Sequence, residues 1–205
     1  MNSKSLDLAH KVLTGIGEAY WQWDLVKESA FYSAQLMKML GYEEEGKFSS
    51  SVIWEEHIES HILEEVTLKV TQHIKGETDK LDITLPLVDN QGKEIWLHAV
   101  GKVIEHIDDK ATMMFGTVKD VTDTKKMIGQ LKKQNDWLML AERISHSGHW
   151  RYDITTETLD WSPEIYRLHG LKIKSVVPTI DSAIDFVLSK DRPKLSWLFL
   201  TLKYY

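Results

Sequence analysis

The spacing of apolar positions predicts a helix, a β-hairpin and a second helix in the first part of the chain. Apolar residues recur at helical spacing over Leu6–Leu13 and again over Ala34–Leu40, where Gly41 provides a natural helix end. Between the two helices, Trp21–Leu25 and Ser29–Ser33 alternate between apolar and polar residues on either side of a polar turn. This alternation is typical of a β-hairpin.

The middle of the chain is predicted to pass from helix to sheet. We expect a polar loop over Glu43–Ser51 and one or two helices over Ile53–Ile74, ended near Gly76. Three long antiparallel strands are then predicted, separated by turns at "DNQG" and "DD": Leu81–Val88, Glu94–Ile104 and Ala111–Val118. Because helices and strands are segregated instead of alternating, the predicted class is α+β.

A further helix is predicted from the segment "DVTDTKK", residues 120–126, to about Ile144, with Thr122 or Asp123 as its N-cap. One side of this helix is apolar and the rest is polar, so the helix requires a partner. A short parallel coiled coil is one possibility, although Asn135 interrupts the apolar seam. The seam consists of Ile128, Leu131, Leu138 and Ala141.

Residues 148–171 repeat residues 19–42 without a gap, at a constant offset of 129 positions. A repeat of this length is far more specific than a short motif. At the same offset Tyr205 corresponds to Gly76, so the second copy is expected to stop before the counterparts of the three long strands. The identical pairs are Trp21/Trp150, Asp24/Asp153, Glu28/Glu157, Ser33/Ser162 and Gly41/Gly170.

Composition narrows the possible functions. The chain is 42% hydrophobic, which is enough for packed cores, and its net charge of −6 argues against nucleic acid as the main partner. Cysteine is absent, which excludes disulfides, thiolate metal sites and a cysteine nucleophile, and which fits the cytoplasmic location that we expect. No apolar run approaches the roughly 20 residues of a membrane-spanning helix.

Four segments together resemble a PAS (sensory-box) domain: the hairpin "YWQWDL…AFYS", the helix "AQLMKMLGY", the strand pair "LDITLPLVDNQGKEIWLHAVGKV" and the ending "FGTVKDVTDTKK". The ending resembles the Asp-Ile-Thr signature of the family's PAC motif, with Val121 in place of Ile. The resemblance implies a five-stranded antiparallel sheet flanked by short helices. It divides the chain into an N-terminal helix (1–13), a PAS domain (14–124), a connecting helix (125–144) and an incomplete second PAS domain (145–205).

The resemblance implies the sensory part of a bacterial-type signalling protein, acting as a homodimer without catalysis. No Gly-rich phosphate loop or Ser-His-acid set is present, and a kinase or diguanylate cyclase output domain does not fit in the chain. An unknown small ligand or a protein partner would act on the first domain, and Asp120 and Thr122 would relay the change to the connecting helix. The ligand-pocket candidates are Trp23, His73, Trp96, His98, Met114 and Thr117.

Two alternatives remain at this stage. One is a dimerisation or scaffold module that binds no small ligand. The other is a haem-based gas sensor, because haem-binding PAS domains present their axial histidine from the helix that holds His73. The sequence "QHIKG" also fits a simple helix end, where a histidine complements the helix dipole. The flavin-adduct type of PAS domain needs a reactive cysteine and is excluded.

Other histidines are weaker candidates. His57 and His61 lie four residues apart, near Glu64 and Glu65, and on one helix face such a set can bind zinc. A solvated helix surface is the favoured interpretation, so no metal site is predicted. His146 is not followed by the residues of a kinase phospho-acceptor motif, and we do not assign it that role.

Overall fold

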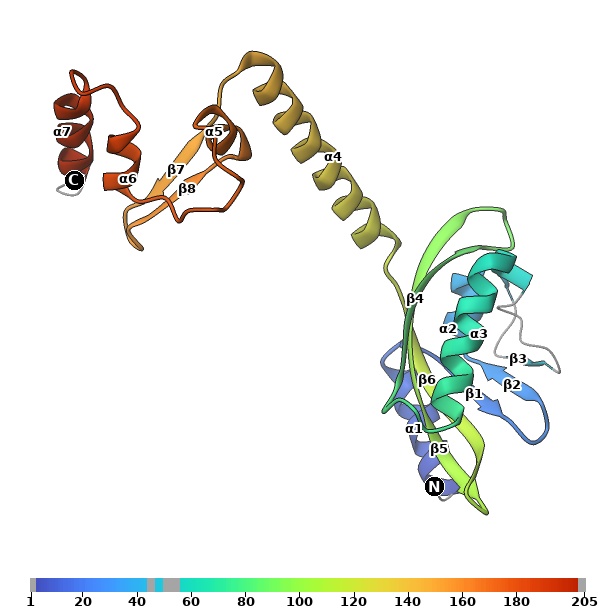
Figure 1. Ribbon diagram of the computed structural model, residues 1–205. Coiled ribbons are helices and arrows are strands. Elements are labelled where there is room, and N and C mark those ends of the chain that lie inside the picture. The colour runs from blue at the N-terminus through green and yellow to red at the C-terminus, as the bar shows by residue number, and fades with distance from the viewer. Residues whose placement is uncertain (1–2, 44–46, 50–55, 203–205) are drawn as a thin grey trace. The chain divides into compact units, whose positions relative to one another are not determined.

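A computed structural model describes residues 3–43, 47–49 and 56–202 (Figure 1). The chain divides into two compact units, residues 1–127 and 128–205. None of the described helices is both long and apolar enough to cross a membrane.

The first unit is built on one antiparallel sheet with the strand order β3-β2-β1-β6-β5-β4. The five strands expected from the alternation are present, so the predicted α+β class is confirmed. A sixth strand, β3, corrects the prediction of a loop over Glu43–Ser51, because three residues there pair with β2 at the sheet edge. The elements are α1 (Ser3–Gly15), β1 (Ala19–Asp24), β2 (Ser29–Tyr32), α2 (Ala34–Met39), β3 (Lys47–Ser49), α3 (Ser60–Ile74), β4 (Leu81–Val88), β5 (Glu94–Ile107) and β6 (Lys110–Asp120).

The core lies between one face of this sheet and the helices α2 and α3. Strand β4 shows the cause most plainly, since every second residue from Leu81 to Leu87 is buried and the residues between them are not. Helix α2 packs on β1 and α3 packs on β4. Met37, Leu40 and Met114 are the largest fully buried side chains among the described residues.

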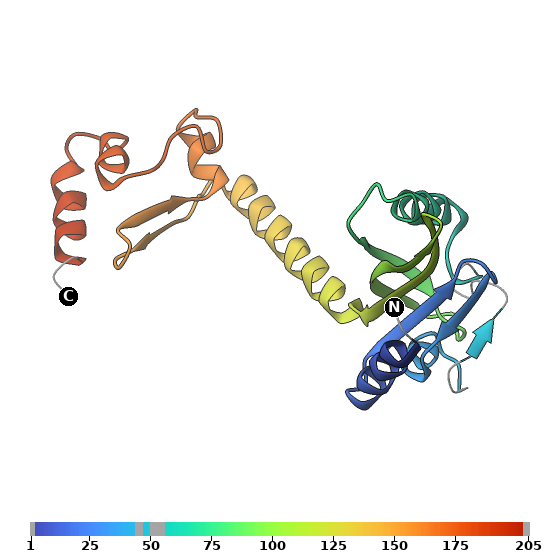
Figure 2. The ribbon, with the colours of Figure 1, turned by 90° about the horizontal axis from the view of Figure 1, so that it is seen from below.

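Helix α1 covers part of the opposite face of the sheet (Figure 2). The His10 imidazole stacks on the rings of Tyr20, Phe31 and Phe115, with centroid distances of 5.1, 5.4 and 5.8 Å. Thr14 adds a hydrogen bond of 3.1 Å between its hydroxyl and that of Tyr20. Sequence reasoning did not identify this aromatic cluster, because its members come from four separate elements, α1, β1, β2 and β6.

The second unit contains a two-stranded sheet and short helices. Helix α4 (Thr122–Ser145) spans the boundary between the units, at residues 127 and 128. It is followed by β7 (Trp150–Asp153), β8 (Thr158–Trp161), α5 (Pro163–Leu168), α6 (Ile180–Asp185) and α7 (Arg192–Leu202). Strands β7 and β8 pair antiparallel, and among the residues of this unit whose burial the structure describes, the buried apolar ones are Leu159, Ile165 and Tyr166.

Candidate functional site

The first unit contains a cavity of about 90 Å³ between the inner face of its sheet and the helices α2 and α3. The surface facing the cavity is almost entirely apolar. Its volume is smaller than the roughly 300–1,000 Å³ of sites for drug-sized ligands. The lining residues are Trp21, Trp23, Ala30, Tyr32, Leu36, Leu40, Val70, Leu81, Ile83, Leu85, Leu87, Leu97, Ala99 and Val118.

Two glycines give the Trp21 indole its place at the cavity wall. Gly101 and Gly116 form a cross-strand pair of β5 and β6, and Gly116 also pairs with Trp21 of β1. A Cβ atom on Gly101 would lie 2.6 Å from Trp21 Cζ2, and one on Gly116 would lie 2.5 Å from the same atom. Only residues without a side chain allow the indole to lie against both strands.

Three predicted pocket residues lie on the inner side of the sheet, although only Trp23 lines the cavity. Met114, directly opposite Trp23 in the ladder, is wholly buried and belongs to the surrounding core. His73 is buried at the end of α3, where main-chain groups hold it.

The other three predicted pocket residues, Trp96, His98 and Thr117, lie on the opposite face. Their neighbours Leu97 and Val118 point into the core, so each of the three points outward and is only partly buried. His98 Nε2 contacts Asp82 Oδ1 there at 2.9 Å. A shift of one residue reverses the face of every side chain on a strand, which is why the sequence pattern did not settle these positions.

His73 does not fit the role of a haem ligand. Its Nε2 accepts a hydrogen bond from the main-chain N–H of Val103 at 3.1 Å, so the proton must be on Nδ1. Nδ1 lies 3.0 Å from the carbonyl oxygen and 3.0 Å from the hydroxyl of Thr78. With both ring nitrogens engaged, no lone pair remains for an iron atom.

The two histidines considered for zinc do not form a site either. His57 precedes α3, which begins at Ser60, so His57 and His61 do not share a helix face. His57 Nδ1 donates to the Val88 carbonyl oxygen at 2.6 Å, and its Nε2 accepts from the Tyr42 hydroxyl at 2.9 Å. Within the described part of the chain, no group of three or more His, Cys, Asp or Glu residues is arranged to hold a metal ion.

The start of α4 is bonded to the main chain of Trp96 on β5. The Trp96 N–H donates to the Thr122 hydroxyl at 2.8 Å, and the Trp96 carbonyl oxygen accepts from the Val121 N–H at 2.8 Å. Asp120 Oδ1 accepts from the Thr122 N–H at 2.8 Å. The prediction of Thr122 or Asp123 as the N-cap is therefore corrected. Asp120 accepts from the Thr122 N–H, one of the N–H groups of the first turn that have no partner within the helix, while the Thr122 hydroxyl bonds to β5.

Side chains reinforce this junction. The ammonium group of Lys125 lies 4.8 Å from the centre of the Trp96 ring, within the range of a cation–π contact. The indole N–H of Trp96 donates to Glu94 at 3.0 Å. Trp96 therefore contributes its main chain, its ring face and its ring nitrogen to the place where the sheet meets the helix.

The turn of the β1–β2 hairpin is organised by Asp24. Its Oδ1 accepts from the main-chain N–H groups of Val26 and Lys27 at 3.1 and 2.9 Å, and its Oδ2 contacts the Lys27 ammonium at 2.9 Å. Partial burial raises the pKa of Asp24, but these hydrogen bonds outweigh burial and hold the pKa below its usual value.

The β7–β8 hairpin of the second unit has the same local structure. Asp153 Oδ1 accepts from the N–H groups of Thr155 and Thr156 at 2.9 and 3.0 Å, and the Thr156 main-chain bond is the largest cause of the lowered pKa of Asp153. Glu28 and Glu157 both have a positive φ, 50° and 52°. The paired register also repeats at the offset of 129, with Trp21 opposite Tyr32 and Trp150 opposite Trp161.

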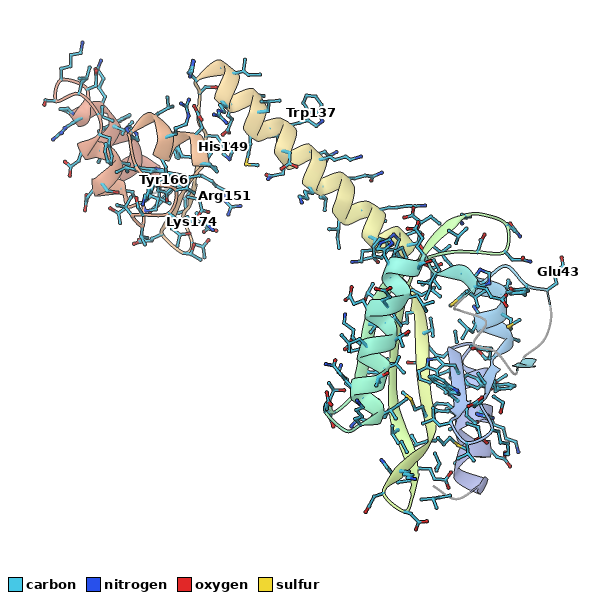
Figure 3. The ribbon with its side chains drawn as sticks, turned by 45° about the vertical axis from the view of Figure 1, so that its right-hand side comes forward. Glu43, Trp137, His149, Arg151, Tyr166 and Lys174 are labelled. Carbon is cyan, nitrogen blue, oxygen red and sulfur yellow. The ribbon has the colours of Figure 1, made fainter. Side chains whose placement is uncertain are left out.

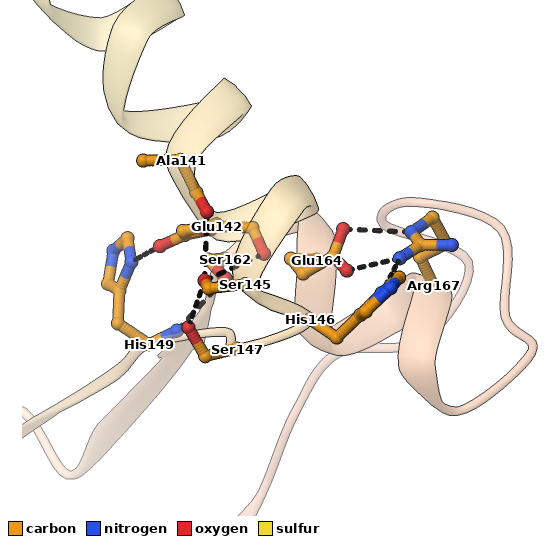
Figure 4. A network of polar contacts seen from close by, with 9 residues as sticks. All are labelled: Ala141, Glu142, Ser145, His146, Ser147, His149, Ser162, Glu164 and Arg167. Carbon is orange, nitrogen blue, oxygen red and sulfur yellow. Dashed lines mark hydrogen bonds and ion pairs between the residues drawn. The ribbon is translucent and has the colours of Figure 1, made fainter.

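A polar network joins the end of α4 to this hairpin and to α5 (Figure 4). Glu142 contacts His149 Nδ1, and the Ser147 N–H donates to the Glu142 carbonyl oxygen at 3.1 Å. Arg167 pairs with the buried carboxylate of Glu164 and approaches His146 Nδ1 at 3.3 Å.

Trp137 extends outward from α4 and is 71% exposed (Figure 3).

No protein-family model matches this sequence, and no curated protein matches it. Solved structures do. The sensory box histidine kinase/response regulator from Burkholderia thailandensis E264 is 19% identical, with 63% of this chain and 96% of that chain covered and a TM-score of 0.52. The PAS domain of a protein from Colwellia psychrerythraea is 16% identical, with 58% and 98% covered and a TM-score of 0.45.

The N-terminal domain of a diguanylate cyclase with a PAS/PAC sensor, from Marinobacter aquaeolei, is also similar. It is 16% identical, with 52% of this chain and 97% of that chain covered and a TM-score of 0.44. The likeness to the Burkholderia protein, together with the antiparallel sheet and its flanking helices, shows that the first unit has the PAS fold.

Proposed function

We propose that the first unit is the sensory module of a bacterial-type signal-transduction protein, which binds a small ligand in its cavity and passes the change to α4. The observation that carries this proposal is the position of two neighbours on β5. Leu97 lines the cavity, and Trp96, the residue before it, holds the start of α4 through both of its main-chain polar groups.

Strand pairing between the cavity and the start of α4 supports this relay. Leu97 is paired with Asp120, and the cavity residue Val118 is paired with Ala99, another cavity residue. A ligand that moves β5 against β6 therefore strains the hydrogen bonds at Trp96 and Thr122. It shifts the helix between two arrangements only by its difference in affinity for them. This role requires binding and no catalysis.

Native mass spectrometry of the purified chain, followed by hydrogen exchange, tests the proposal. A bound ligand would appear as an excess mass that disappears on denaturation. Removing it should change the exchange rates of the amides of Trp96, Val121 and Lys125, which lie at or next to the junction. A ligand whose removal leaves all three rates unchanged would contradict the relay.

A second candidate role is dimerisation through α4, with or without a ligand. Ile128, Leu131 and Leu138 are on the apolar side of this helix and are 58, 64 and 64% exposed. Exposed apolar residues at this spacing favour pairing with a second helix, and a homodimer would supply an identical one.

We also propose that the second unit begins a second domain of the same type. The support is local, since the Asp-centred turn, the positive φ of the glutamate and the strand register recur at the same offset. Replacing Asp24 and Asp153 separately by Ala tests this, because equivalent turns should lose comparable protection of their hairpin amides.

A further inference from the structure

We infer that the ligand of the first unit is a small, neutral, apolar molecule, of the size and character of a simple aromatic hydrocarbon. This inference rests on the proposed sensory function and gives its ligand a chemical class. Two observations support it: the residues that line the cavity, and the packing of the Trp21 indole against Gly101 and Gly116.

The lining selects against polar ligands. A cavity of about 90 Å³ has room for several waters, each of which needs roughly 10–15 Å³ and two or more polar partners. The lining supplies aliphatic carbon from Leu36, Leu85, Leu97 and Val70, and few polar atoms face the cavity. A ligand with a hydroxyl, amide or charge would lose its water there without full replacement, whereas an apolar one loses little.

The aromatic walls select for shape. Trp21 and Trp23 come from the same strand and line the cavity together, so a flat ring can lie against an indole in an offset arrangement. The space available depends on Trp21 remaining against Gly101 and Gly116. A methyl group on Gly101 would meet Trp21 at 2.6 and 2.8 Å and would displace the indole.

The experiment is a titration of the full chain, labelled at the tryptophan indole nitrogens and followed by NMR, with toluene and separately with phenol. The two probes have nearly the same shape and differ in one hydroxyl group. The Trp21 and Trp23 signals are assigned with the Trp21→Phe and Trp23→Phe variants. We expect toluene to shift both signals saturably and phenol to bind about tenfold more weakly.

Gly101→Ala tests whether ligand binding depends on the position of the Trp21 indole. Gly129→Ala is its control, since a Cβ at Gly129 on α4 has no atom within 4 Å. Toluene should bind about tenfold more weakly to Gly101→Ala and unchanged to Gly129→Ala. If Gly101→Ala does not fold, Ala99→Val narrows the same cavity from β5 and carries the same expectation. Equal toluene affinity in the narrowed and control variants would overturn the inference.

The remaining outcomes separate the ligand class from the proposed function. If phenol shifts the two indole signals at lower concentrations than toluene, the apolar class is wrong and the sensory function stands. If toluene binds without changing exchange at Trp96 and Val121, the class stands and the relay is wrong. If no probe shifts either signal and no excess mass is found, both are overturned.

Discussion

The Nε2 atom of His73 accepts a hydrogen bond of 3.1 Å from the main-chain N–H of Val103. Strand β4 begins at Leu81, which pairs with Gly101, so Val103 lies beyond the reach of the β4 ladder. The imidazole replaces the missing strand partner, and its Nδ1 meets the Thr78 carbonyl oxygen at 3.0 Å. A neutral histidine thus connects the end of α3, the approach to β4 and strand β5.

Replacing His73 by Ala should lower the free energy of unfolding of the first unit by about 2 kcal/mol, because a buried imidazole is removed and the partly buried Val103 N–H loses its acceptor. His61→Ala is the control. His61 is on the exposed surface of α3, where its Nδ1 lies 3.4 Å from the Glu59 carboxylate, so its removal should cost less than about 0.5 kcal/mol. Urea unfolding followed through the amide signals of the sheet measures both. An equal loss of unfolding free energy in the two variants would contradict the role of His73 in connecting α3 to β5.

Thr122→Val should weaken the junction between the sheet and α4 while keeping the shape of the side chain. The Trp96 N–H then loses its acceptor, and the unfolding free energy should fall by about 1–2 kcal/mol. Exchange of the Trp96 amide should become faster. Thr122→Ser retains the hydroxyl and should keep the slow exchange, so equally fast exchange in the two variants would exclude the hydroxyl as the cause.

The β1–β2 hairpin should lose stability in acid through Asp24. Because the pKa of Asp24 in the folded chain lies below its unfolded value near 3.9, the ionised carboxylate stabilises the fold above that value, and this contribution is lost as pH falls through the folded pKa. Asp24→Asn keeps an acceptor oxygen without the charge. The difference in unfolding free energy from the parent, at most about 1 kcal/mol at pH 6, should shrink towards zero in acid. A difference that is constant across this range would contradict the assignment.

The sequence was sufficient for five of the six strands of the first sheet, and insufficient for β3 and for several positions of the site. Regular alternation located β4, whose observed bounds equal the predicted ones, because Leu81, Ile83, Leu85 and Leu87 are all buried on one face. The same alternation did not say which face of β5 holds Trp96 and His98, since both faces carry apolar residues and helix α1 covers part of the outer one. Apolar content alone could not distinguish the two faces.

The sequence also did not predict which residues far apart in the chain would contact one another. His73 was considered for haem because of its helix and its apolar neighbours, but its true partners, Val103 and Thr78, are set by where β4 begins. The position of the Trp21 indole could have been predicted from the sequence, because a glycine stands in the middle of each of two long strands. Glycine within a strand often marks a close approach, and here Gly101 and Gly116 mark the place of the indole.

The exposed apolar side of α4 should be sensitive to an added charge if it forms a dimer contact. If two chains pair along this helix, Leu131→Glu places a charge in the seam and should weaken the dimer by about tenfold or more, because a carboxylate would be buried without a partner. Gln130→Glu is the matched control, since it adds the same charge one position away from the seam, at another exposed residue. Sedimentation across a concentration series measures both variants against the parent. A dimer of equal strength in all three chains would place the contact elsewhere, and a parent that stays monomeric would contradict pairing along α4.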